Sequence, residues 1–134
     1  MKPKTNRRSS GCPISYGLDV FGDKWTLLII REIMLNGKRT YSEFLQADEG
    51  IATNILISRL KQLENDAIVE KYRDPNNRRS FVYHLTQKGR DLAPIILEIV
   101  IWSGVYDYRP NAMREVLEKI LRDRSGFEAK LRKG

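Results

Sequence analysis

The hydrophobic pattern of the chain changes its period after the segment ATNILISRLKQLEN, and this change constrains the fold more than any other feature. Within that segment, Leu56, Leu60 and Leu63 recur at the spacing of an α-helix. Over residues 68–73 and 80–86 the two faces of the chain alternate, as they do in β-strands. The polar run DPNNRR between them predicts a β-hairpin with its tip there. We therefore expect a hairpin directly after a helix.

Start signals for three further helices precede this point. Pro13 begins a short first helix, and Asp23 is a good N-cap for a second helix over KWTLLIIREIML. Thr40 and Glu43 have the spacing of a capping box, which predicts a short third helix. The glycine-bearing turn ADEG separates this helix from the one over ATNILISRLKQLEN. Two short helices joined by a tight turn are a candidate helix-turn-helix.

The segment beyond the hairpin is again helical in pattern. Thr86 is expected to cap one long helix that runs through Trp102, with a bend at Pro94 because proline removes a backbone hydrogen bond. A last amphipathic stretch covers residues 111–124. The order of elements predicts a mainly α fold with a small β-hairpin wing, a winged helix-turn-helix. The expected divisions are a flexible basic arm at 1–10, the winged helix-turn-helix domain at 11–108, and a C-terminal helix with a basic tail at 109–134.

The charge balance favours a polyanionic partner. The formal net charge is +7 and the isoelectric point about 9.7, which suit nucleic acid or an anionic membrane surface. The longest apolar run, at 94–102, is interrupted by Glu98 and is far shorter than the roughly 20 residues that span a bilayer. The N-terminal MKPKTNRRSS lacks the hydrophobic stretch of an export signal, so the cytoplasm is the expected compartment. Nucleic acid, and not a membrane, is the expected partner.

Side chains suited to catalysis or metal binding are scarce. Cys12 is the only cysteine and His84 the only histidine, so an internal disulfide and a zinc site with several cysteine or histidine ligands are excluded. Neither residue lies in a recognisable catalytic signature. We therefore expect no enzymatic activity, no metal and no cofactor.

The helix before the hairpin has a polar face suited to DNA. If its leucines face the core, a helical wheel at 100° per residue turns several polar side chains away from the core. Asn54 can pair with adenine through two hydrogen bonds, and Ile57 can contact a thymine methyl group. Arg59 lies nearer the core edge and suits the fold or a phosphate. The predicted DNA-contacting residues are Thr53, Asn54, Ile57, Ser58 and Lys61. The alternative is an ordinary solvated helix surface.

The hairpin tip carries the second candidate contact. In this layout the helix enters a major groove about 12 Å wide, and the hairpin reaches the flanking backbone or minor groove. Paired arginines on such a tip suit phosphates or the minor groove. The predicted contact residues of the tip are Asn76, Asn77, Arg78 and Arg79. The alternative is a set of ordinary charged turn residues.

Three segments of the chain form a joint pattern: CPISYGLDVFGDKWTLLIIREI, GIATNILISRLKQLENDAIVEK and YHLTQKGRDLAPIILEIVIW. This pattern resembles the HxlR family of bacterial transcriptional regulators, winged helix-turn-helix proteins related in architecture to MarR-type repressors. The resemblance implies a homodimer, joined through its first and C-terminal helices, that binds a two-fold-related double-stranded DNA operator and acts as a repressor. The alternative is a winged-helix module for protein interaction or RNA, without operator specificity.

The segment PIILEIVIW independently indicates a dimer. It is apolar on nearly every face, which in so small a domain suggests burial against a second chain. With the first helix, the candidate interface residues are Ile14, Leu18, Ile95, Ile96, Ile99 and Trp102. The alternative is that the residues of the C-terminal helix belong to the core of a single chain.

Two positions depart from the family pattern. Ala52 stands where many relatives have a serine that caps the DNA-reading helix, so Thr53 is a candidate N-cap in its place. Ala67 stands where relatives often have glycine before the hairpin, which leaves the geometry of that turn open.

Cys12 is similar in position to a cysteine that senses electrophiles or oxidants in several family members. A helix N-terminus stabilises a thiolate, and Pro13 indicates that Cys12 lies at such a terminus. Cys12 is therefore a candidate sensor thiol for a small electrophilic or oxidant effector. The alternative is a small packing residue at the dimer contact.

Overall fold

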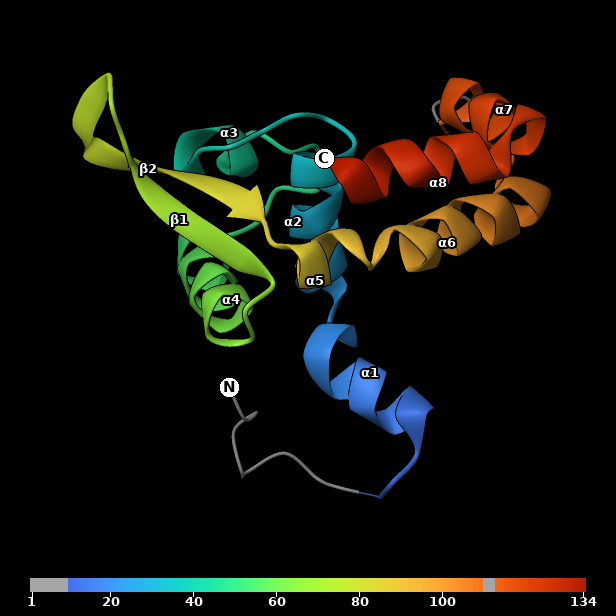
Figure 1. The fold of residues 1–134 in the computed structure, drawn as a ribbon, viewed down its shortest axis with the longest axis horizontal. Helices are drawn as coiled ribbons and strands as arrows, with labels where there is room; N and C mark the ends of the chain where they lie inside the picture. The colour runs from blue at the N-terminus through green and yellow to red at the C-terminus, as the bar shows by residue number, and fades with distance from the viewer. Residues whose placement is uncertain (1–9, 110–112) are drawn as a thin grey trace.

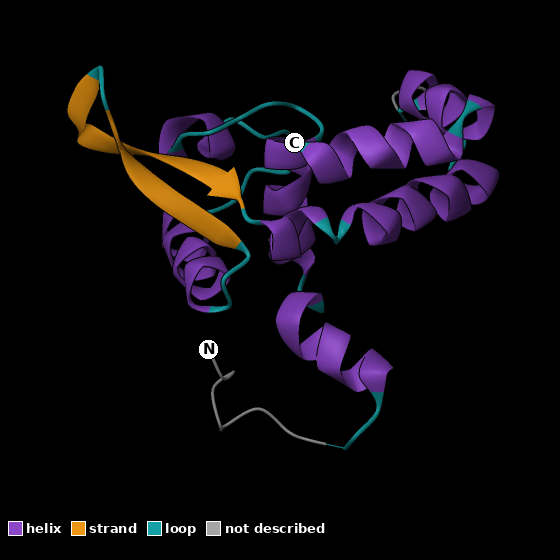
Figure 2. Cartoon of the chain, in the orientation of Figure 1, coloured by secondary structure: helices purple, strands orange, loops and turns teal. Residues whose placement is uncertain are grey.

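The computed structural model describes residues 10–109 and 113–134. Figure 1 shows α2 near the centre, with the hairpin, α3 and α4 to one side, α6 to α8 to the other, and α1 extending away. Helices dominate, as Figure 2 shows. The elements are α1 (Pro13–Phe21), α2 (Lys24–Met34), α3 (Tyr41–Leu45), α4 (Thr53–Asn65), β1 (Val69–Asp74), β2 (Asn77–Leu85), α5 (Gln87–Arg90), α6 (Ala93–Tyr106), α7 (Arg114–Arg122) and α8 (Arg124–Lys133).

The predicted helix starts are confirmed. Pro13 opens α1. Asp23 caps α2, because its carboxylate accepts the backbone N–H groups of Trp25 and Thr26. Thr40 and Glu43 form the expected capping box at α3. These helix starts could be predicted from the sequence because each cap is made by residues within one turn of the helix.

The core lies between α2, α3, α4 and the start of β1. The predicted inward residues of α4, Leu56, Leu60 and Leu63, are all buried. They pack with apolar residues of the neighbouring elements, notably Ile30 and Phe44. Because one face of α4 is fixed in this core, the opposite face is held toward solvent.

The hairpin is attached to the rest of the fold at its base. β1 and β2 pair antiparallel in the register Val69↔Leu85. Thr40 forms an isolated bridge with Val82, and the Tyr83 N–H donates to the Arg39 carbonyl at 2.7 Å. The hairpin is therefore anchored beside the start of α3, while its tip extends beyond the core (Figure 1).

The turn between α4 and β1 uses a left-handed residue. Ala67 has φ +59°, a conformation that costs an L-residue roughly 1–2 kcal/mol relative to the right-handed region. The N–H of Ile68 still donates to the Leu63 carbonyl at 2.9 Å, so the turn closes normally. Glycine would reach this φ without penalty.

The long helix predicted from Thr86 through Trp102 is wrong as a single element. Thr86 does cap a helix, but this helix is the short α5, and α6 begins after a turn at residues 91–92. Pro94 lies in the first turn of α6, where a missing N–H breaks no helical hydrogen bond. The proline therefore starts a helix and does not bend one.

The C-terminal helices fold back along the molecule. α7 and α8 pack on α6, and α8 also reaches α5. Most of the arm predicted at 1–10, and the first residues of the stretch predicted at 111–124, lie outside the described residues. Within 10–109 and 113–134, no helix is long and apolar enough to cross a bilayer.

Candidate nucleic-acid interface

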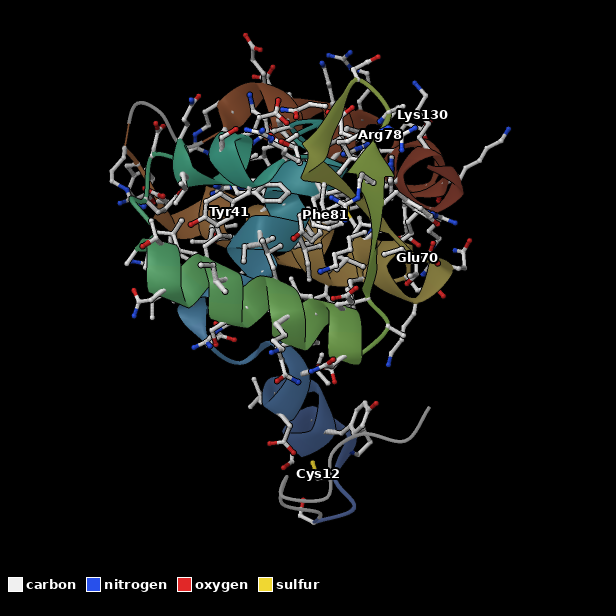
Figure 3. The ribbon with its side chains drawn as sticks, turned by 90° about the vertical axis from the view of Figure 1, so that its left-hand side faces the viewer. Cys12, Tyr41, Glu70, Arg78, Phe81 and Lys130 are labelled. Carbon is white, nitrogen blue, oxygen red and sulfur yellow. The ribbon has the colours of Figure 1, made fainter. Side chains whose placement is uncertain are left out.

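The outer face of α4 carries the side chains predicted to read DNA. Thr53, Asn54, Ile57, Ser58 and Lys61 are all exposed. Their exposure follows from the burial of the three leucines on the opposite side of the helix. Figure 3 views the molecule from the side that carries α4 and the hairpin, which lie beside one another on it. The wheel prediction is thus confirmed as geometry.

The start of α4 corrects the prediction that Thr53 caps this helix. The N-cap is Ala52, whose extended backbone places its carbonyl to accept the Leu56 N–H at 2.9 Å. Thr53 is the first helical residue, and no side chain caps this end. The Thr53 hydroxyl is therefore not used as a cap and stays on the outer surface of the first turn.

Arg59 joins α4 to α2, as its position on the wheel suggested. Its Nε lies 2.8 Å from Oδ2 of Asp23, the residue that caps α2. Burial would raise the pKa of the Asp23 carboxyl, but hydrogen bonds from Thr26, Arg59 and backbone N–H groups outweigh it and hold that pKa below its usual value. The orientation of α4 is thereby tied to the N-terminus of α2.

The hairpin tip is tighter than the sequence suggested. The turn consists of residues 75–76 only, and β2 begins at Asn77. The prediction that Arg78 and Arg79 sit on the turn is therefore wrong: both are exposed strand residues. The strand register shifts at this place, because Arg73 pairs with Phe81 and Asp74 with Asn77. Residues 78–80 therefore form a bulge without pairing partners on β1, and both arginines lie in it beside the tip.

The asparagines of the tip take part in its own hydrogen bonds. The N–H of Asn76 donates to Asp74 Oδ1 at 2.8 Å. The Asn77 side chain accepts the Arg79 N–H at 3.2 Å and donates to Ser80 Oγ at 3.1 Å. The Asn77 side chain therefore stabilises the conformation of the tip.

Two further positively charged residues of the hairpin were not predicted from the sequence as contact residues. Lys71 and Arg73 of β1 each lie 4.6 Å from the centre of the Phe81 ring. The Arg73 guanidinium also donates to the Arg78 carbonyl at 2.5 Å. Their alternation along β1 placed them on one face, but only the strand register shows that this face meets Phe81.

The predicted dimer residues fall into two groups. Ile14 and Leu18 of α1 are 73% and 57% exposed, and Ile99 and Trp102 of α6 are 46% and 68% exposed. Ile96 is only 5% exposed and belongs to the core of its own chain, so it is not available to contact a second protomer. For this residue the alternative of an intramolecular core position is correct. Ile95 is half-buried.

The sequence reasoning did not single out several exposed residues at the end of α6. Val105, Tyr106 and Tyr108 are all exposed, and the Tyr106 ring packs 5.2 Å from that of Trp102. Together with Ile99 and Trp102 they extend the apolar surface to the C-terminus of this helix.

Cys12 lies at the free end of α1. It is exposed, it is the residue directly before Pro13, and its side chain makes no capping hydrogen bond. Figure 3 shows Cys12 at the opposite end of the molecule from Arg78. Any effect of this thiol on the outer face of α4 or on the hairpin would therefore be indirect.

Comparison with known proteins identifies the chain. Residues 20–113 match the HxlR-like helix-turn-helix family. The helix-turn-helix transcriptional regulator YybR of Bacillus subtilis strain 168 is 33% identical over 108 residues, which cover 81% of this chain and 80% of YybR.

Solved structures give the same result. The candidate transcription factor PA1607 is 33% identical with a TM-score of 0.70, over 80% of this chain and 73% of PA1607. The redox regulator HypR in its reduced form is 33% identical with a TM-score of 0.60, over 81% of this chain and 99% of HypR. The chain therefore belongs to the HxlR family of winged helix-turn-helix transcriptional regulators, which are DNA-binding proteins and not enzymes.

Proposed function

We propose that this regulator binds a two-fold-related operator as a homodimer, with α4 of each protomer in a major groove and each hairpin on the flanking backbone. The observation that carries the proposal is the exposed polar face of α4 beside a basic hairpin on one side of the molecule (Figure 3). No acidic residue stands between Thr53 and Leu63, so this part of α4 does not repel phosphates.

Each side chain of the reading face has a role that its chemistry supports. Asn54 pairs with an adenine through two hydrogen bonds, and Ile57 contacts a thymine methyl group. Thr53 and Ser58 bond to bases or phosphates, and Lys61 binds a phosphate. On the hairpin, the proposed backbone and minor-groove contacts are Asn76, Asn77, Arg78 and Arg79.

The exposed apolar surfaces of α1 and α6 support a homodimer. Ile14 and Leu18 project from a helix that extends away from the rest of the molecule (Figure 1). Ile99 and Trp102 add a second surface, with half-buried Ile95 at its edge. Apolar surfaces of this kind mark protein contacts. A two-fold dimer sets its reading helices about one DNA turn, roughly 34 Å, apart.

Repression is the proposed direction of regulation. A dimer that covers two successive major grooves occupies the duplex that a polymerase would need. Winged-helix modules for protein interaction or RNA are the competing class, and such modules do not need the acid-free reading face around Asn54. Duplex DNA with an inverted repeat is thus the expected ligand.

Selection of bound fragments from a random duplex library is expected to recover an inverted repeat. Asn54→Ala should relax one adenine position of each half-site, lowering discrimination there by about 1–3 kcal/mol, because the bidentate contact is lost. The measurement is the affinity for the selected site and for its single-base variants. Lys61→Ala is the matched control, and it should weaken all duplexes alike. Recovery of no repeat, or equal binding to structured RNA, would contradict operator recognition.

We further propose that Cys12 lets an electrophile release the operator. The thiol is exposed and lies directly before α1, the helix whose apolar side chains are proposed to hold the dimer. HypR, one of the similar structures, is described as a redox regulator and has been solved in oxidised and reduced forms. A group added to Cys12 would disturb the packing of α1 against the partner.

Treatment with p-benzoquinone is expected to weaken operator binding by about tenfold or more in the native protein, since loss of a bivalent contact has effects of this size or larger. Cys12→Ser should bind the operator with native affinity, and the quinone should not change that affinity. Binding is measured by fluorescence anisotropy before and after treatment, with adduct formation followed by mass spectrometry. If the adduct forms at Cys12 and affinity is unchanged, the residue is a packing residue and not a sensor.

A further inference from the structure

A chain of hydrogen bonds runs from the N-terminus of α2 to the reading face of α4. At one end, Asp23 accepts the N–H groups of Trp25 and Thr26 at 3.0 and 3.1 Å and the Thr26 hydroxyl at 2.5 Å. In the middle, Arg59 Nε donates to Asp23 Oδ2 at 2.8 Å. At the other end, the Arg59 guanidinium donates to Ser58 Oγ at 3.2 Å. The Ser58 hydroxyl, at which this series of hydrogen bonds ends, lies on the surface proposed to face DNA.

The Asp23 end of this chain is rigid. Its carboxylate is held by three donors of the first turn of α2, and this turn lies against the core. An ionised carboxylate only accepts hydrogen bonds, so it orients the Arg59 guanidinium toward itself. Because the guanidinium is planar, fixing Nε on Asp23 also fixes the direction of the nitrogen that meets Ser58.

The Arg59 contact determines what the Ser58 hydroxyl can do. A guanidinium has only donors, so Ser58 Oγ must accept from it. The hydroxyl proton is then available to a different acceptor. In the part of the chain that the structure describes, Arg59 is the one hydrogen-bond partner of this hydroxyl. The proton is thus left to an acceptor outside the protein.

We propose that Asp23 and Arg59 position Ser58 as a hydrogen-bond donor to DNA, which makes Arg59 a specificity-determining positioning residue of the reading helix. The acceptor on the duplex is a base-edge atom of the major groove, namely purine N7, guanine O6 or thymine O4. This inference rests on the proposed function of α4. It goes beyond it by giving Ser58 a donor role and by giving Arg59 a part in sequence reading without a base contact.

The competing explanation is that Arg59 only ties α4 to α2. That role would make its loss lower the thermal stability of the protein and the affinity for every duplex alike. The proposed role instead makes the loss of Arg59 relax the same operator position that the loss of Ser58 relaxes. A phosphate acceptor for Ser58 would likewise give equal losses on operator and random duplex.

The test is a double-mutant cycle in the full-length protein. Ser58→Ala, Arg59→Met, the double variant and Asp23→Asn are compared for binding to the selected operator, to each single-base variant of it and to random duplex. Asn is itself a good N-cap, so Asp23→Asn keeps the start of α2 while it removes the charge that holds Arg59. Melting temperatures are recorded for all variants to separate folding from reading.

We expect Ser58→Ala and Arg59→Met each to lower the ratio of operator affinity to random-duplex affinity by about tenfold, at one and the same base position. The double variant should lose no more than either single variant, and Asp23→Asn should relax the same position. Additive losses, or relaxation of different positions, would overturn the positioning role.

Two outcomes separate this inference from the proposed function. If the native protein prefers no operator over random duplex, the proposed function fails and the inference falls with it. If the native protein prefers its operator and Ser58→Ala leaves that preference unchanged, only the inference fails.

Discussion

Trp102→Glu is expected to convert the protein from a dimer to a monomer and to lower its affinity for a two-fold-related operator by a factor on the order of 10² or more. Trp102 is the most exposed of the three accessible apolar residues proposed for the interface on α6, and the ring of its neighbour Tyr106 packs against it. A carboxylate at this place would have to be buried without a partner charge for the dimer to form.

The expected fall in operator affinity follows from the loss of bivalent binding. A dimer that has bound one half-site places its second reading helix at a high effective concentration beside the other half-site. A monomer must bind each half-site independently, so its affinity for the full operator falls to that for a half-site. We therefore expect the variant to bind the full operator and an isolated half-site with nearly equal affinity.

Leu121→Glu is the matched control. Leu121 is also a large, exposed apolar residue, but it lies on α7, outside the proposed α1 and α6 surfaces. Sedimentation velocity should show a dimer for the native protein and for Leu121→Glu, and a monomer for Trp102→Glu. A Trp102→Glu protein that still sediments as a dimer would remove α6 from the interface.

The elements that could be predicted are those specified within a few residues. The N-caps at Asp23 and Thr40 depend on side chains that reach only the next turn, and the inner face of α4 depends on leucines three and four apart. Local hydrogen bonding and helical period determine these features. The placement of the reading face was accessible for the same reason.

The break between α5 and α6 could not be predicted, because distant contacts determine it. A Cβ on Gly89 would lie 2.3 Å from the Ile68 carbonyl oxygen, so the last turn of α5 packs directly on the start of the hairpin. Arg90 donates to the Leu85 carbonyl at 2.8 Å and to the Arg132 carbonyl at 3.0 Å, and the second of these partners is 42 residues away. Helical period alone does not contain such contacts.

The positive net charge predicted a nucleic-acid partner, but most of this charge does not lie on α4 or the hairpin. Within residues 20–113, the family-matched segment, 13 lysines and arginines stand against 12 aspartates and glutamates. Nearly all of the excess positive charge thus lies in the terminal segments. What favours DNA in the matched segment is the arrangement of its charges: an acid-free face on α4 and cations gathered on the hairpin.

The combined substitution Arg78→Ala and Arg79→Ala is expected to weaken binding to every duplex by about tenfold or more and to flatten its dependence on salt. Each phosphate contact contributes a slope of about −0.9 to log affinity against log salt concentration, so its loss is read directly from the slope. Both arginines are exposed beside the hairpin tip, so each hairpin offers two positive charges to the DNA backbone. For a dimer, the slope should therefore fall in magnitude by about 2 if one arginine per hairpin contacts a phosphate, and by about 4 if both do.

The single substitutions show whether one arginine or both contact the DNA backbone. If both contact a phosphate, the two single variants should lose similar affinity. If only one does, its single variant should account for most of the loss. Lys119→Ala with Arg122→Ala removes two exposed positive charges from α7 and controls for net charge alone. An equal fall in slope for this control would mean that the long-range field of the protein, and not the hairpin, produces the effect.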